Sequence, residues 1–181
     1  TTRYQGSKRK ISSQLSQCFS QIPFTRALDL YSGTYSVSLI LRMHGKVVDS
    51  NDYLLFNNNT SKMYLNFDQD IILCGKHENI IRELIETSNS NYSTVQENYG
   101  GIFFTDDENR QIDNFCSNIS DLNGFEKYLY TYAVGQALLK KRPYNLFHRA
   151  NLGMRTKNVK RSFGNAATWE TSILSHSLKA I

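Results

Sequence analysis

Two carboxylates and a glycine turn lie at the spacing of a nucleoside site. Residues 27–34 read Ala-Leu-Asp-Leu-Tyr-Ser-Gly-Thr, a strand-like run that ends in a turn. About twenty residues later a second apolar run, 46–48, leads to Asn51 and Asp52. A doubly wound sheet holds a nucleoside in this way, because a glycine turn lets the backbone approach the ligand and a carboxylate after the next strand accepts from ribose hydroxyls. The pattern predicts a nucleoside site at the carboxyl ends of two neighbouring strands.

A basic and aromatic run opens the chain. Residues 3–8 read Arg-Tyr-Gln-Gly-Ser-Lys, in which Tyr4 offers an aromatic face, Gly6 a tight turn and Lys8 a cation. Together these groups could pack on a sulfonium ligand and pair with its carboxylate. Taken alone, the run is more simply a basic arm.

Apolar periodicity places regular elements around these residues and predicts an α/β fold class. Helices are expected at 11–21, 35–44, 53–65, 78–88, 105–119 and 124–140 and from 168 onward, and strands at 26–31 and 46–50, with short strand pieces near 102–104 and 144–148. Thr105 precedes three acidic residues, which predicts a helix N-cap. Two clear strands are fewer than a complete doubly wound sheet has, so the sheet is expected to be incomplete.

The charges of the chain are segregated along the sequence. Residues 1–28 hold five Lys or Arg and residues 140–161 hold eight, both without an acid, whereas residues 29–139 hold seven against fifteen Asp or Glu. Two basic ends around an acidic middle indicate a surface for a polyanion. An ordinary basic loop is the alternative.

Several classes of protein are disfavoured by composition. Cys18, Cys74 and Cys116 form no Cys-x-x-Cys pair, which indicates reduced, buried thiols in a cytoplasmic protein and not a metal site. No apolar run reaches the roughly 18 residues of a membrane span, and no secretory core opens the chain, so no membrane partner is expected. The four histidines lack metal-ligand spacing and no Gly-x-Ser-x-Gly elbow occurs, which disfavours a hydrolase.

In their order along the chain, residues 3–8, 29–33 and 51–52 resemble the N-terminal portion of the alpha-group N6-adenine-specific DNA methyltransferases. This family contains the GATC-type adenine methylases and their type II restriction–modification relatives. Branch-level similarity continues through the stretches 98–105, 112–113, 146–152, 159–165 and 168–169.

The resemblance implies a Rossmann-like S-adenosylmethionine-dependent methyltransferase fold with a helical, basic target-recognition insert. It implies a cofactor-binding part at 1–75, the insert at 76–167 and a return toward the catalytic half at 168–181. S-adenosylmethionine would lie against Tyr4 and Lys8, with its amino-acid portion near the turn. The cofactor residues carried over are Tyr4, Lys8, Asp29, Tyr31, Gly33 and Asp52. For Asp52, a helix N-cap is the competing interpretation.

The same resemblance makes residues 140–165, hereafter the basic segment, the target-recognition region for double-stranded DNA. Arginine and lysine neutralise phosphates, arginine reads guanine and asparagine reads adenine. The candidate DNA-binding residues are His148, Arg149, Asn151, Arg155, Lys157, Lys160, Arg161 and Asn165. For each of them a solvated loop position is the alternative.

Two positions depart from the family pattern. Tyr35 stands where the family usually has a second glycine, so it needs either an ordinary φ or a rearranged turn, with its ring away from the pocket. The Asp/Asn-Pro-Pro-aromatic motif that holds the flipped adenine is missing, since the only prolines are Pro23 and Pro143. We therefore expect a truncated or split enzyme that is inactive alone.

The leading prediction is thus the N-terminal portion of a site-specific DNA adenine-N6 methyltransferase that uses S-adenosylmethionine. The alternative is a non-catalytic DNA-binding or specificity subunit that requires a separate chain carrying the catalytic motif. A methyltransferase acting on RNA is a third hypothesis. A comparison of binding to duplexes with binding to single strands distinguishes this third hypothesis from the other two.

Overall fold

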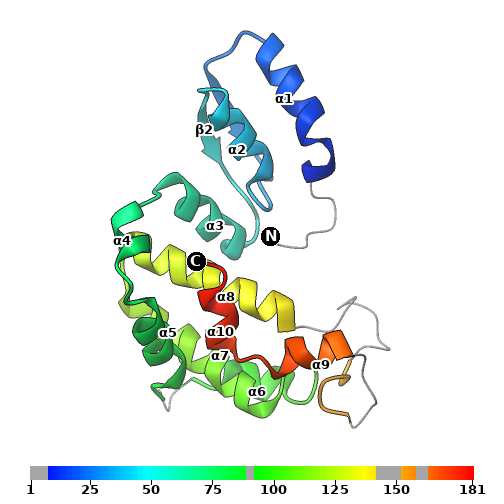
Figure 1. Ribbon diagram of the computed structural model, residues 1–181, viewed down its shortest axis with the longest axis vertical. Coiled ribbons are helices and arrows are strands. Elements are labelled where there is room, and N and C mark those ends of the chain that lie inside the picture. Colours follow the sequence, from blue (N-terminus) through cyan, green and yellow to red (C-terminus); the bar gives the residue numbers. More distant parts are fainter. Residues whose placement is uncertain (1–7, 89–91, 142–151, 158–162) are drawn as a thin grey trace. The chain divides into compact units, whose positions relative to one another are not determined.

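The computed structural model describes residues 8–88, 92–141, 152–157 and 163–181, the last range without the side chains of 163–165 (Figure 1). The chain divides into two compact units, residues 1–67 and 68–181. Described by itself, the first is an α/β unit and the second is helical. None of the described helices is long and apolar enough to cross a membrane.

The first unit is a parallel strand–helix–strand unit with a helix on either side in sequence. Its elements are η1 (Lys8–Ile11), α1 (Ser12–Gln21), β1 (Arg26–Asp29), α2 (Ser36–Met43), β2 (Val47–Ser50) and α3 (Leu55–Leu65). β1 pairs with β2 in parallel, with Asp29 opposite Ser50. α2 packs against both strands and α1 packs against α2 (Figure 1). Because parallel strands need a crossover, α2 carries the chain back and both strands end at one edge.

One face of this two-stranded sheet is open. Val48 faces α2's side and is buried, whereas Leu28 and Val47, on the opposite face, are 62% and 56% exposed. Arg26 and Asp49 lie on the same open face and form an ion pair of 3.0 Å across the strands. Parallel sheets are normally covered on both faces, so the described first unit leaves apolar surface uncovered.

The second unit buries its core between helices. Its elements are α4 (Gln69–Leu73), α5 (His77–Glu86), α6 (Thr94–Tyr99), α7 (Asp106–Asn118), η2 (Ile119–Asp121), α8 (Gly124–Lys141), α9 (Phe163–Glu170) and α10 (Ile173–Leu178). α10 packs on α8 and α5, and α5 packs on α7 (Figure 1). Ile81, Phe115, Tyr130 and Ile173 are among the buried core side chains.

The six helices predicted before residue 141 and both clear strands are confirmed within a few residues. The single helix predicted from 168 onward is wrong, because α9 ends at Glu170 and α10 begins at Ile173, after the Ser172 N-cap. The N-cap at Thr105 is confirmed as a full capping box, because its side chain accepts from the Glu108 amide and Glu108 accepts from the Thr105 amide. The strand predicted near 102–104 is wrong: Gly101 has φ 70° and the chain turns there. The piece near 144–148 lies outside the described residues.

The structural division falls after Phe67, so α4 belongs to the helical unit. The functional boundary at 75 stays a prediction. Residues 168–181 also belong to that unit, through α10. The prediction that the cysteines are buried is wrong, since Cys18, Cys74 and Cys116 are exposed free thiols. On α7 the buried positions go to larger apolar residues such as Ile112 and Phe115, which leaves Cys116 outside.

Candidate functional site

Backbone hydrogen bonds join the turn after β1 to the end of β2. The Asn51 amide donates to the Asp29 carbonyl at 2.9 Å, and the Ser32 amide donates to the Asn51 carbonyl at 2.9 Å. These bonds continue the sheet pairing one step beyond each strand. The residues that follow the two strands are thus held next to each other, as the sequence pattern predicts.

Asp52 closes this turn with its side chain. Its Oδ2 accepts from the Gly33 amide at 2.8 Å, and its Oδ1 accepts from the Leu54 amide at 2.9 Å and from Asn57 Nδ2 at 3.0 Å. Desolvation opposes ionisation, but the hydrogen bonds from Leu54, Asn57 and Gly33 outweigh it and hold the pKa of Asp52 below its ordinary value. The side chain is therefore a carboxylate at neutral pH.

Asp52 is not the N-cap of α3, which begins at Leu55 after Leu54. Its bond to the Leu54 amide two residues on is an Asx-type turn. A carboxylate has about four acceptor positions, and three hydrogen bonds occupy Oδ1 twice and Oδ2 once. Oδ2 can therefore accept one further donor, such as a hydroxyl group.

Two asparagines that the sequence analysis did not single out hold Asp52 in place. Asn57, only 4% exposed, donates to the carboxylate. Asn58 binds the Asp52 backbone at both ends: its Oδ1 accepts from the amide at 3.1 Å and its Nδ2 donates to the carbonyl at 2.7 Å. A run of three asparagines after Phe56, where α3 is otherwise expected to present apolar residues, is the signal in the sequence.

Asp29, Tyr31 and Gly33 are brought to the same edge as Asp52. Asp29 Oδ2 accepts from the Ser38 amide at 3.1 Å and from Ser38 Oγ at 2.5 Å, which ties β1 to the first turn of α2. Tyr31 is 80% exposed, so its ring is open to a ligand. Gly33 has φ 51°, the region that glycine adopts without a Cβ penalty.

Tyr35 takes a left-handed backbone conformation. With φ 64° it is the one non-glycine residue of positive φ in the described ranges. Its ring is 1% exposed and stacks on Tyr64 of α3, with ring centroids 5.5 Å apart and planes 4° apart. The ordinary φ offered as one possibility is therefore wrong. The residue takes a backbone conformation that favours glycine, and its ring packs in the unit's interior.

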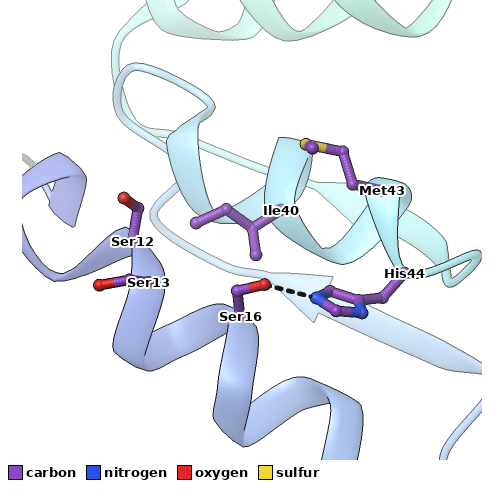
Figure 2. Close-up of a pocket in the computed structure, with 6 residues that line it drawn as sticks. All are labelled: Ser12, Ser13, Ser16, Ile40, Met43 and His44. Atoms are coloured by element: carbon purple, nitrogen blue, oxygen red, sulfur yellow. Dashed lines mark hydrogen bonds between the residues drawn. The ribbon is translucent and has the colours of Figure 1, made fainter.

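The N-terminal run is described from Lys8 onward, so Tyr4 lies outside the described residues. Lys8 is exposed in η1. Beyond η1, a pocket of about 400 Å³ lies between α1 and α2 and is lined by Ser12, Ser13, Ser16, Ile40, Met43 and His44. Figure 2 shows Ser16 Oγ hydrogen-bonded to His44 Nε2, at 2.7 Å. Of the predicted cofactor residues that the structure describes, none lines this pocket.

The described part of the basic segment places Arg155 inside the second unit. Arg155, expected to contact DNA, is 7% exposed, and both of its terminal nitrogens donate to the buried Glu108. A guanidinium enclosed in this way faces protein and not solvent. Lys157 is exposed in the turn at 152–157. Asn165 lies in α9 without a described side chain, and His148, Arg149, Asn151, Lys160 and Arg161 lie outside the described residues.

A parallel strand–turn–helix–strand unit with a pre-set carboxylate at its edge is the type of α/β unit that binds nucleosides. The chain belongs to the D12 class of N6 adenine-specific DNA methyltransferases, a family that it matches over residues 4–174. It is 29% identical over 147 residues to the type II methyltransferase M2.HphI of Haemophilus parahaemolyticus. That match covers 80% of this chain and 41% of the relative, so the chain spans less than half of the relative's length. No solved structure gives a significant match.

Proposed function

We propose that this chain is the cofactor-binding and DNA-recognition portion of a site-specific DNA adenine-N6 methyltransferase of a restriction–modification system. The observation that carries the proposal is the network at the strand ends, in which the Asp52 carboxylate binds the Gly33 amide and keeps one acceptor position open. Membership of the adenine methyltransferase family supports this assignment. The enzyme acts in the cytoplasm, where its cofactor and DNA are.

S-adenosylmethionine is the cofactor that fits these residues, and when bound it supplies an activated methyl group. Asp52 accepts one ribose hydroxyl through Oδ2. Asp29 fixes the turn through Ser38, so that Gly33 and Tyr31 border the amino-acid portion. Tyr4 and Lys8 complete the site from the N-terminal run. These residues bind and orient the cofactor, and holding two reactants in position is a large part of the catalysis expected.

The groups that hold the flipped adenine come from outside residues 1–181, because the sequence has no Pro-Pro pair. They complete a Rossmann-like sheet. The open face at Leu28 and Val47 supports this, since covering it would remove apolar side chains from water. Residues 1–181 alone are accordingly inactive in methyl transfer.

The basic segment binds duplex DNA. Its eight Lys and Arg without an acid between residues 140 and 161 support phosphate binding. His148, Arg149, Asn151, Lys157, Lys160, Arg161 and Asn165 are the residues we assign to DNA. Arg155 is left out, because its guanidinium is enclosed with Glu108.

Isothermal titration of S-adenosylmethionine into the chain tests the proposal. Asp52→Ala removes the carboxylate and is expected to weaken binding at least tenfold. Asp49→Ala is the matched control, because Asp49 is an exposed carboxylate on the open face of β2, the strand that leads to Asp52. Absence of binding by the folded parent chain, or equal affinity in the two variants, would refute the assigned cofactor site.

A DNA-binding or specificity subunit without cofactor is the second candidate, favoured by the segregated basic residues. Salt-dependent binding of duplex DNA without any binding of S-adenosylmethionine would favour it. Preference for single-stranded RNA over duplex DNA would argue against both candidates.

A further inference from the structure

Three charged side chains are buried together in the second unit. Glu108 is 8% exposed, Lys141 2% and Arg155 7%. Glu108 lies in the first turn of α7, Lys141 is the last residue of α8 and Arg155 belongs to the turn at 152–157. Buried charges are costly unless they are paired and hydrogen-bonded, so this cluster needs an explanation.

The Glu108 carboxylate binds both cations. Lys141 Nζ lies 2.9 Å from Glu108 Oε1, Arg155 Nη2 donates to the same oxygen at 2.8 Å, and Arg155 Nη1 pairs with Oε2. The Thr105 amide also donates to Oε2, at 3.1 Å. One side chain therefore connects the start of α7, the end of α8 and the turn that holds Arg155.

Further contacts bring α9 into the cluster. Lys141 Nζ donates to the Trp169 carbonyl at 2.8 Å and also to the Thr171 carbonyl. The Arg155 guanidinium lies over the rings of Phe104 and Trp169, at 5.8 Å and 5.5 Å from the centroids. Both cations thus fix their own positions against backbone carbonyls and rings, as well as against Glu108.

Lys141 and Arg155 stand at the two ends of residues 142–154, a stretch that contains His148, Arg149 and Asn151. We propose that Glu108 is a positioning residue for DNA binding, because it holds both ends of this stretch and so sets the frame from which the basic segment meets DNA. The proposal rests on the DNA-binding function proposed above. Glu108 itself touches no DNA.

Removing the Glu108 charge distinguishes this proposal from a purely electrostatic effect, because the two predict opposite changes in DNA affinity. Glu108→Gln makes the chain more positive by one charge, which by itself strengthens binding to a polyanion. Loss of these ion pairs instead weakens binding, because Lys141 and Arg155 must then be fixed at a cost in entropy when DNA binds. Glu83→Gln is the matched control, since Glu83 is an exposed acid of α5 in the same unit.

The experiment is fluorescence anisotropy with an adenine-containing duplex over a range of salt concentrations. We expect Glu108→Gln to bind at least tenfold more weakly than the parent, with a shallower slope of log K against log salt, because fewer phosphates are contacted. Glu83→Gln should bind as the parent does or slightly more tightly. Equal binding and slope in the two folded variants would overturn the proposal.

Circular dichroism and tryptophan fluorescence show whether Glu108→Gln stays folded. If it unfolds, the variant Glu108→Leu/Lys141→Met/Arg155→Met replaces the whole cluster, since apolar replacement of a buried ion cluster is often tolerated. It is compared with Arg82→Met, which changes the net charge equally at an exposed site of α5. Weaker binding and a shallower slope support the proposal, whereas equality with Arg82→Met overturns it. No DNA binding by the parent chain would instead refute the DNA-binding function itself, and the inference with it.

Discussion

Substitution of Tyr35 by glycine sets two effects against each other. Glycine accepts the observed φ of 64° without a Cβ penalty, and glycine is the residue that the resemblance implies at this position. The substitution also deletes a ring that is 1% exposed and stacked on Tyr64. The change in the free energy of unfolding of the first unit shows which effect is larger.

The magnitudes indicate that the loss of the Tyr35 ring outweighs the relief of the backbone. Relief of a left-handed conformation is worth about 1–2 kcal/mol for a residue other than glycine. Truncation of a buried aromatic side chain costs about 3–5 kcal/mol, and the greater freedom of glycine in the unfolded chain costs about 0.5–1 kcal/mol more. Tyr35→Gly should therefore lower the free energy of unfolding of the first unit by about 1.5–5 kcal/mol.

Native-state hydrogen exchange at the amides of β1 and β2 measures this loss unit by unit, which a single unfolding curve of a two-unit chain does not. Tyr35→Asn is the control, because asparagine tolerates the left-handed region yet also lacks the ring. It should lose stability as well, by somewhat less than the glycine variant. The only tryptophan, Trp169, belongs to the second unit, so its unfolding transition should stay unchanged. A glycine variant as stable as the parent would refute this reasoning.

Three further predictions concern single hydrogen-bonded groups. Thr105→Ala removes the side-chain half of the capping box and should cost about 1 kcal/mol, whereas Thr105→Ser should cost little; equal urea midpoints for all three chains, measured by tryptophan fluorescence, would contradict this. Asn57→Ala removes a bond that lowers the pKa of Asp52, so S-adenosylmethionine titrations should show weaker binding and a greater loss at pH 5 than at pH 8; a parallel pH profile would contradict it. Despite desolvation, the bonds of Arg155 and Lys141 lower the pKa of Glu108, so its stabilising effect is present above the unfolded value of about 4.3. That effect should be lost as pH falls through the pKa of Glu108 in the folded chain. Acid unfolding of the second unit at the same pH in the parent and in Glu108→Gln would contradict this.

The elements that local chemistry specifies could be predicted from the sequence. Periodic apolar residues gave α1, α5, α7 and α8, and Thr105 with its acids gave the start of α7. The sequence predicts a strand after Gly101 because aromatic and β-branched residues favour strands. There the positive φ of Gly101 turns the chain, a backbone preference that overrides side-chain propensity.

The meeting of residues at the strand ends was predictable because they recur at short intervals along one strand–helix–strand unit. Asp29, Gly33 and Asp52 do meet at the strand ends. The support from Asn57 was not foreseen, since an asparagine in a helix gives no sign of the partner its side chain will have. The partner of Arg155 was still less predictable, because Glu108 lies 47 residues away in sequence and only tertiary packing brings the two together.

This difference in the sequence separation of interacting residues affects how each of the two proposed activities depends on the fold. The hydrogen bonds of the Asp52 network join residues between Asp29 and Asn58, all within the first unit. The Glu108 cluster joins residues from Phe104 to Thr171 and exists only when the helices of the second unit are packed. Net charge alone therefore overstates what the basic segment offers to DNA, because Lys141 and Arg155 are already bound by Glu108. In our proposals, Lys141 and Arg155 contribute to DNA binding by placing their neighbours, whereas the proposed cofactor network needs only its own unit to be folded.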